Sequence, residues 1–419
     1  MTTKWQWLMR QFARTLWVRA SLYCVLAVGT ALLAIAIEPV IPEGIAGVVG
    51  ADAVDHVLDI LASSMLAVTT FSLTVMVSAY AAATSNVTPR ATRLLMQDTT
   101  TQNVLSTFLG SFLFSLVGII ALSTGAYGES GRLVLFVVTL GVITVVVVAL
   151  LRWISHLTHF GRVGDTTARV ENATCCALRE RVRKPFLGGC ALASDDAVPA
   201  GAQPVTAARI GYVQHIDMAE LERSACQHGA QLYLAVLPGS FVHLQTVMVR
   251  VSGELSDELR DCVLGAISVS DERSFDQDPR FGLCVLAEIA SRALSPAVND
   301  PGTALDVLGR AVRILSCWTP PTEAPTEVEF PNIHVPSLSV DDLLADLFGP
   351  IARDGASLIE VQVRLQKSLL ALAEMDPSRF ALATRALSRR AVRLAEQALV
   401  LEADRDAVRM LSRRLDGMN

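Results

Sequence analysis

The pattern of apolar positions divides the chain near residue 155. Four long apolar stretches precede this point, and each approaches the roughly 20 residues that a helix needs to cross a bilayer. They cover residues 20–37, 57–83, 104–122 and 133–151. The first stretch ends in Glu38-Pro39 rather than in a small-residue cleavage site, so we interpret it as a membrane helix and not as a signal peptide. The pattern predicts a transmembrane domain of four helices over residues 1–155.

Basic residues flank these four spans unevenly. They crowd the amino-terminus, the connection after the second span and the exit of the fourth span, whereas the other two connections contain only Arg132. The positive-inside rule then places both termini in the cytoplasm. We therefore expect a multi-pass protein that has the lipid bilayer as a partner.

The second span carries a polar stripe, which we call the hydroxyl seam. At about 100° per residue, the helical repeat gathers small and hydroxyl-bearing side chains on one face, with His56 and Asp59 at its outer end. The seam continues through Ser63, Thr70, Thr74, Ser78 and Ser85. Polar groups are costly against acyl chains, so we expect the seam to face protein or water. It either lines a polar path or lets helices pack closely around an axis.

Beyond residue 155 the sequence reads as soluble protein. We predict a helical connector and linker at 156–206, an α/β domain at 207–319, a proline-rich connection at 320–336 and a helical region at 337–419. Strands are expected at 209–216, 231–237, 245–251 and 266–270, and helices at 218–228 and 256–264. The fold class is an α-helical membrane protein, with four transmembrane helices and a cytoplasmic α/β plus helical-bundle region.

A dense group of polar side chains follows the last predicted strand of the α/β domain. Its members are Asp271, Glu272, Arg273, Gln277 and Asp278. A proline opens the helix after this loop, and a helix start beside charged and amide groups can hold an anion or a small polar ligand. The loop is therefore one half of a candidate ligand site.

The other half of the candidate site lies where this helix breaks, at Ser295. Asn299 or Asp300 can cap the next helix, and Thr303 lies in its first turn. The alternative is structural, because Asn-Asp-Pro is also a stop-start signal between two antiparallel helices. In that case Glu272 and Arg273 supply an ion pair that stabilises the fold.

Composition removes several classes of function. The chain has 419 residues, of which 52% are hydrophobic, and its net charge of −6 gives no sign of a nucleic-acid partner. The eight cysteines form no CxxC motif, which favours a reduced compartment and no metal site. We interpret the adjacent Cys175 and Cys176 as ordinary helix cysteines rather than as a metal or redox pair.

Motifs of known catalytic chemistry are absent from the sequence. It contains no GxSxG, HExxH, Walker A or Rossmann glycine pattern. Paired carboxylates occur only in predicted linkers and caps. We therefore assign no catalytic residue and no cofactor, and we expect that the protein is not an enzyme.

Several stretches of the sequence resemble a known family. They are Thr84-Ser85-Asn86-Val87-Thr88-Pro89-Arg90, Gly211-Tyr212-Val213-Gln214 with Ile216-Asp217, Asp271-Glu272-Arg273 with Gln277-Asp278, and Ala293-Leu294-Ser295-Pro296-Ala297-Val298-Asn299-Asp300-Pro301. Together with the four spans, they resemble the bacterial predicted membrane proteins catalogued as domain of unknown function 2254. The resemblance covers nearly the whole chain. It implies a protein of the bacterial inner membrane and supplies no reaction.

Three functional hypotheses follow. The leading one is a channel- or transporter-like homo-oligomer, in which the hydroxyl seam lines an ion path or packs around an axis and the cytoplasmic domain regulates it. The alternative is a membrane-anchored sensor or scaffold that binds a small polar ligand or a protein partner at the candidate site. A membrane enzyme is the least favoured of the three.

Overall fold

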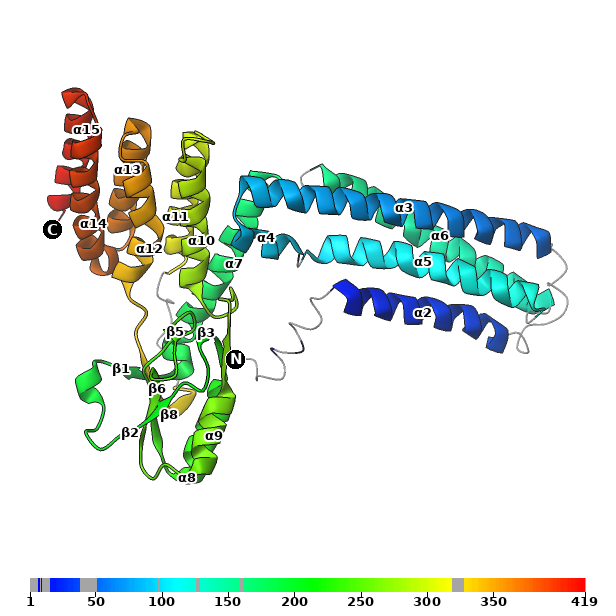
Figure 1. Ribbon diagram of the computed structural model, residues 1–419, viewed down its shortest axis with the longest axis horizontal. Coiled ribbons are helices and arrows are strands. Elements are labelled where there is room, and N and C mark those ends of the chain that lie inside the picture. Colours follow the sequence, from blue (N-terminus) through cyan, green and yellow to red (C-terminus); the bar gives the residue numbers. More distant parts are fainter. Residues whose placement is uncertain are drawn as a thin grey trace. The chain divides into compact units, whose positions relative to one another are not determined.

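The computed structural model of the chain describes residues 7, 9, 16–37, 51–96, 98–125, 129–158, 161–318 and 328–418. Its contacts divide the chain into two units (Figure 1). The amino-terminal unit is Leu8–Thr166, and the carboxy-terminal unit combines Met1–Trp7 with Thr167–Asn419.

The amino-terminal unit is helical. Its elements are α2 (Leu16–Ile37), α3 (Ala51–Asn86), α4 (Pro89–Met96), α5 (Thr99–Ser123) and α6 (Glu129–Leu157). The side chain of Asp98 caps α5, because its carboxylate accepts a hydrogen bond from the Thr101 amide at 2.8 Å.

Among the described residues, three helices are long and apolar enough to cross a membrane. They cover Ala53–Thr84, Thr99–Ser123 and Ser130–Leu157, and each contains one of the second, third and fourth predicted spans and extends beyond it at both ends. The first predicted span is not among them, since the apolar stretch described for α2 runs only from Trp17 to Leu32.

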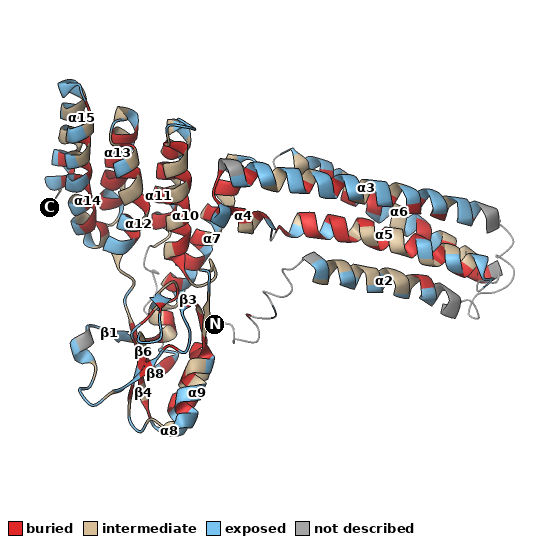
Figure 2. Cartoon of the chain, in the orientation of Figure 1, coloured by how far each residue is buried: buried red, intermediate tan, exposed pale blue. Residues whose placement is uncertain are grey.

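α5 lies at the centre of this unit, in contact with α2, α3 and α6. Figure 2 shows buried stretches along α5. Its buried residues include Ser106, Gly110, Ser111, Ser115 and Gly118. A Cβ atom at Gly110 would lie 3.3 Å from the carbonyl oxygen of Tyr23, and one at Gly118 would lie 3.1 Å from Leu58. These small residues let α2 and α3 approach closely.

The carboxy-terminal unit contains most of α7 (Val163–Arg183) and two sheets. The larger sheet has the order β1 (Gly189–Leu192), β8 (Phe330–Pro336), β4 (Gln231–Leu234), β6 (Val247–Ser252) and β2 (Gln203–Thr206). β8 is parallel to β1 and β4, and the other pairs are antiparallel. The smaller sheet is antiparallel, in the order β5 (Phe241–Val242), β3 (Gly211–Ile216) and β7 (Ile267–Ser270).

Both sheets share one core with α8 (Met218–His228) and α9 (Asp257–Ala266). The helix predicted at 218–228 is confirmed as α8, and the other elements predicted between 209 and 270 appear with ends shifted by a few residues. The residues predicted as linker and as proline-rich connection instead contribute β1, β2 and β8. These strands pair with partners far away along the chain, such as Gly189 with Phe330, so local patterning could not reveal them.

Six helices complete this unit. They are α10 (Pro279–Ala293), α11 (Pro301–Ser316), α12 (Val340–Asp354), α13 (Ile359–Met375), α14 (Pro377–Ala398) and α15 (Glu402–Asp416). α12 contacts α10 and α14, and α13 contacts α11 and α15. These helices form a row of three helix hairpins (Figure 1). The helical region predicted at 337–419 supplies two of them, and the third, α10 with α11, comes from the segment predicted as the α/β domain. Two short 3-10 turns, η3 (Pro185–Gly188) and η4 (Asp195–Ala197), flank β1.

Candidate functional site

α10 separates the two halves of the predicted ligand site. Arg273 and Asp278 precede its first residue, whereas Asn299 and Asp300 follow its last residue. Its 15 residues span about 21 Å at the usual rise of a helix. The two halves are therefore separate groups and cannot bind one small ligand together.

The group after α10 forms a helix start. Asp300 caps α11, because its carboxylate accepts hydrogen bonds from the amide and the hydroxyl of Thr303 at 3.1 and 2.6 Å. These bonds lower the pKa of Asp300 below its usual value. Asn299 adopts a left-handed backbone with φ of 50°, and the hydroxyl of Ser295 donates to the carbonyl of Arg292. This geometry matches the structural alternative for the Asn-Asp-Pro turn.

The loop before α10 is fastened to β3. Gln277 accepts a hydrogen bond from the Ile216 amide at 3.1 Å, and Gln214 donates to the carbonyl of Glu272 at 2.7 Å. Asp271 lies 3.9 Å from Arg209 on the surface. These contacts fix the position of the loop that carries Arg273 and Asp278.

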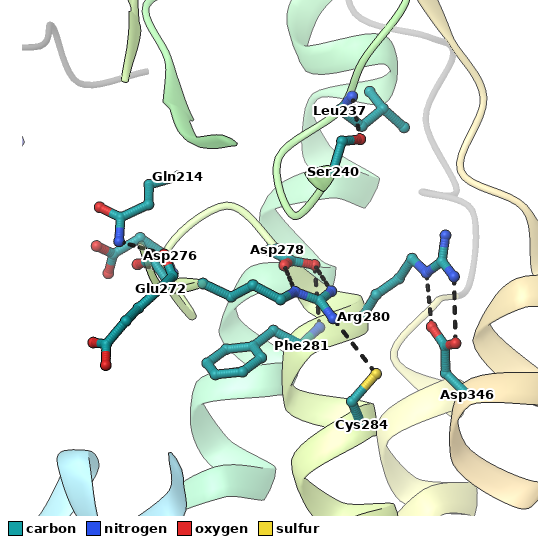
Figure 3. Close-up of polar contacts among 12 residues, drawn as sticks. Gln214, Leu237, Ser240, Glu272, Asp276, Asp278, Arg280, Phe281, Cys284 and Asp346 are labelled. Atoms are coloured by element: carbon teal, nitrogen blue, oxygen red, sulfur yellow. Dashed lines mark hydrogen bonds and ion pairs between the residues drawn. The ribbon is translucent and has the colours of Figure 1, made fainter. Parts of the chain in front are cut away.

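A buried ion pair lies at the start of α10. Arg273 donates to both carboxylate oxygens of Asp278, at 2.8 and 3.0 Å, and Asp278 also caps α10 at the Phe281 amide (Figure 3). Burial raises the pKa of Asp278, although the bonds from Arg273 act in the opposite direction. A Cβ atom at Gly239 would collide with this carboxylate, so only a glycine lets the turn after β4 rest on it.

A second arginine joins α10 to α12. Arg280 donates to both oxygens of Asp346, at 2.7 and 3.3 Å, and to Asp342 at 2.7 Å. Figure 3 shows Arg280 and Asp346 facing one another beside Asp278. Arg280 therefore pairs with two carboxylates, unlike Arg273, which pairs with one.

These groups border a hollow of about 410 Å³, which we call the arginine cavity. Its wall comes from α7, from residues 235–241 after β4, from the start of α10, from residues 336–339 after β8 and from α12. Three arginines line it, namely Arg181, Arg273 and Arg280. Its volume lies within the range of small-molecule sites.

Arg181 differs from the other two arginines because no carboxylate pairs with it closely. Its side chain is 8% exposed, and within the described part of the chain its Nη1 atom has no hydrogen-bond partner. Burial lowers its pKa to about 10, and the charge of Asp278 acts in the opposite direction. The guanidinium thus stays charged at neutral pH. A buried cation of this kind is suited to an anionic group of a ligand.

The arginine cavity offers little reactive chemistry. Its lining contains no histidine, cysteine or lysine among the described residues, and its hydroxyls at Ser240 and Ser339 accept bonds from the amides of Leu237 and Asp342. Across the described ranges no group of three or more metal-binding side chains comes together. The arrangement can bind and orient a ligand.

Sequence reasoning found Arg273 and Asp278 and missed the rest of this cavity. Arg181 lies on α7, and Asp342 and Asp346 lie on α12, so more than 60 residues separate each of them from the predicted loop. The sequence does carry a turn signal at Pro238-Gly239, and the contact with Asp278 requires its glycine.

The hydroxyl seam lies on the outward face of α3. His56, Asp59, Ser63, Thr70, Thr74 and Ser78 are all exposed. The chain's own helices do not cover these side chains. Thr70 and Thr74 donate to the carbonyls four residues earlier, at 2.9 and 3.0 Å, and Ser63 does the same at 2.9 Å. The side chain of Ser85 lies outside the described residues.

Comparison with known proteins gives the family. The profile described as "Predicted membrane protein (DUF2254)" matches residues 13–371. Uncharacterized proteins of Mycobacterium bovis and of two strains of Mycobacterium tuberculosis are 27% identical over 247 residues, which is 57% of this chain and 47% of each relative. The chain thus spans about half the length of these curated relatives, and no solved structure matches it. Because the profile covers well over half of the sequence, the chain belongs to the DUF2254 family of predicted membrane proteins.

Proposed function

We propose that this protein is a membrane-anchored sensor, whose carboxy-terminal unit binds a small anionic molecule in the arginine cavity. The observation that carries the proposal is the buried Nη1 atom of Arg181, which has no partner among the described residues. Desolvation of an unpaired guanidinium costs several kcal/mol, so a fold that keeps one gains from a ligand that pairs with it.

The distribution of charge indicates how such a ligand lies. Arg181 is deeply buried, whereas the carboxylate of Asp342 is about half exposed. An anionic group therefore reaches inward to Arg181, and a neutral or cationic part of the ligand lies near Asp342. Small phosphate esters and carboxylates that also carry a donor fit this description.

The test is calorimetric titration of the full-length protein in lipid nanodiscs. The probes are sulfate, inorganic phosphate, succinate and a nucleoside monophosphate. We expect the wild type to bind at least one of them with a Kd at or below about 1 mM. Arg181→Met should abolish this binding, whereas Arg183→Met, which removes an exposed arginine from the same helix, should keep it. Equal affinity in both variants, or no binding of any probe by the wild type, would refute the proposal.

As a sensor the protein releases its ligand unchanged, so we propose that it is not an enzyme. The lining of the arginine cavity is consistent with this view, since its described residues are arginines, aspartates, serines and apolar groups. Mass spectrometry of the probe after long incubation is the check. Conversion of the probe that disappears in Arg181→Met would contradict the proposal.

We also propose that the anchor has four spans in the bacterial inner membrane, with both termini in the cytoplasm. α2 is then the fourth span beside the three long apolar helices. Trp7 supports an even number of spans. It precedes α2, yet it is buried in the carboxy-terminal unit, where it donates to Asp276 at 2.9 Å and stacks on His215. A chain that leaves and returns to one side of a membrane crosses it an even number of times.

A channel- or transporter-like oligomer is a second candidate, and the outward position of the hydroxyl seam favours it. Neighbouring copies or water can reach Thr70 and Thr74, since both are exposed. Their bonds to the backbone also make contact with lipid tolerable, which is the competing explanation. Ion flux into proteoliposomes separates the two. Flux that Thr70→Leu with Thr74→Leu abolishes supports a path, and absence of flux in the wild type removes this candidate.

A further inference from the structure

Two cysteines that are far apart in the sequence meet in the carboxy-terminal unit. Cys175 lies in the middle of α7 and Cys317 ends α11, and their Sγ atoms are 3.6 Å apart. A disulfide needs about 2.0 Å between the sulfurs, so a shift of less than 2 Å would join them. Cys176 follows Cys175 in the sequence but is exposed, because successive helical side chains point about 100° apart.

The two thiols have different surroundings. Cys175 is buried, and burial raises its pKa above the usual value for a thiol. Cys317 is half-buried and lies beside the exposed guanidinium of Arg179, one turn after Cys175 on α7. The charge of Cys317 and its hydrogen bond with Arg179 raise the pKa of that arginine. Cys317 is therefore the more accessible of the two thiols, and Cys175 lies behind it.

The surrounding contacts hold the two helices in register. Glu171 lies one turn before Cys175 on α7, and it accepts hydrogen bonds from Arg310 and Arg313 of α11, each at 2.6 Å. The sulfurs therefore meet at an interface that ion pairs already fix. Two thiols alone make a poor metal site, and no metal cluster forms among the residues that the structure describes.

We infer that Cys175 and Cys317 form a reversible disulfide when the protein meets a peroxide, with Cys317 as the attacking residue and Cys175 as the resolving one. The thiolate of Cys317 attacks one oxygen of hydrogen peroxide. The O–O bond breaks, hydroxide leaves and takes up a proton as water, and Cys317 becomes a sulfenic acid.

Cys175 then attacks the sulfur of this sulfenic acid. The S–S bond forms, the S–O bond breaks, and the proton of Cys175 leaves with the hydroxyl as a second water. The sum is two thiols and one peroxide giving one disulfide and two waters. A dithiol reductant reverses the step by exchange. In a reduced compartment the disulfide is thus a transient modification.

The experiment treats the full-length protein in detergent with hydrogen peroxide and maps cross-links by mass spectrometry. Cys175 and Cys176 share one tryptic peptide, residues 170–179, so the Cys176→Ser variant identifies the residue that reacts. We expect a peptide that joins Cys175 to Cys317 in the wild type and in Cys176→Ser, and its loss after dithiothreitol. In Cys175→Ser, dimedone should trap the sulfenic acid on Cys317. Arg179→Met should slow the reaction severalfold.

Two outcomes would overturn the inference. One is a cross-link that survives in Cys175→Ser, because Cys176 would then be the partner. The other is reduced Cys175 and Cys317 after excess peroxide in a Cys176→Ser sample that elutes on size exclusion as the untreated protein does. Elution shows that the sample is folded, so a failed reaction cannot be ascribed to unfolding.

Discussion

At the scale of single residues, the two arginines of the cavity that lie deepest differ in what holds them. Arg273 forms two hydrogen bonds to Asp278, so the pair is part of the fold. Arg181 is just as enclosed but has no such carboxylate. If Arg181 has the ligand-binding role that we propose, replacing it and replacing Arg273 should change the stability of the ligand-free protein in opposite directions.

We expect Arg181→Met to raise the unfolding temperature of the ligand-free protein, with a gain on the order of 1–3 kcal/mol, because methionine fills similar space without a charge to desolvate. The matched control is Arg273→Met, which leaves Asp278 buried and unpaired and should cost about 3–5 kcal/mol. Differential scanning fluorimetry of both variants in detergent is the measurement. A loss of stability in Arg181→Met as large as in Arg273→Met would assign both arginines a structural role.

The same contrast explains what the sequence could reveal about the site. Arg273 and Asp278 are close along the chain, so the sequence showed both charged side chains in one predicted loop. Arg181 comes from a helix about 90 residues earlier, and an arginine among several on a polar helix looks like surface. Only the folded chain shows that this one faces inward.

At the scale of helices, the buried small residues belong to α5 and not to the seam of α3. Sequence periodicity found the stripe on α3 because hydroxyls repeat there at helical spacing. Burial depends on which neighbours surround a helix, and α5 makes extensive contacts with both α2 and α3 and also packs on α6. Hydropathy located α3 and α5, since the spans predicted at 57–83 and 104–122 lie inside the observed helices, but it did not reveal their packing faces.

Gly110→Leu should disrupt the packing of α2 on α5, since even a Cβ atom at this position lies 3.3 Å from a backbone oxygen of Tyr23. The control is Gly141→Leu on α6, where nothing lies within 4 Å of the added Cβ. Fluorescence-detected size exclusion after heating is the measurement. We expect a loss of about 1–3 kcal/mol, or failure to assemble, for the first variant only. Equal melting of the two variants would show that α2 does not depend on this contact.

The joint between α7 and α11 should depend on pH. Burial alone would raise the pKa of Glu171, but hydrogen bonds from Arg313 and Arg310 hold it below its usual value. A carboxylate with a lowered pKa stabilises the folded state above its unfolded value, near pH 4.3, and this contribution is lost as pH falls through the folded value. Thermal unfolding should be measured for the wild type and for Glu171→Gln between pH 3 and 7. We expect the free energies of unfolding of the two proteins to differ by about 1 kcal/mol at pH 7 and to become equal in acid. A difference that stays the same at every pH would contradict this explanation.

At the scale of the whole chain, the sequence anticipated a membrane part followed by a mixed α/β and helical part. It did not anticipate that residues before the first apolar helix join the later unit. By sequence Trp7 is one of several aromatic residues near the amino-terminus, and only its partners Asp276 and His215 reveal its place. The three strands missed in predicted linkers have the same cause, which is pairing over long distances.

The position of Trp7 leads to a prediction about topology. Fusions of green fluorescent protein and of alkaline phosphatase to each terminus should report both ends in the cytoplasm, as an even number of crossings requires. Trp7→Ala should leave this topology unchanged, because the apolar helices and flanking charges determine it. Phosphatase activity at one terminus with fluorescence at the other would mean three spans and would exclude α2 as a membrane helix.

The boundary between the two units falls inside α7, between Thr166 and Thr167. The residues of α7 that follow this boundary include Glu171, Cys175 and Arg181. One helix of a single unit therefore contributes to the ion pairs with α11, to the thiol pair with Cys317 and to the wall of the arginine cavity, so a change in this helix affects all three.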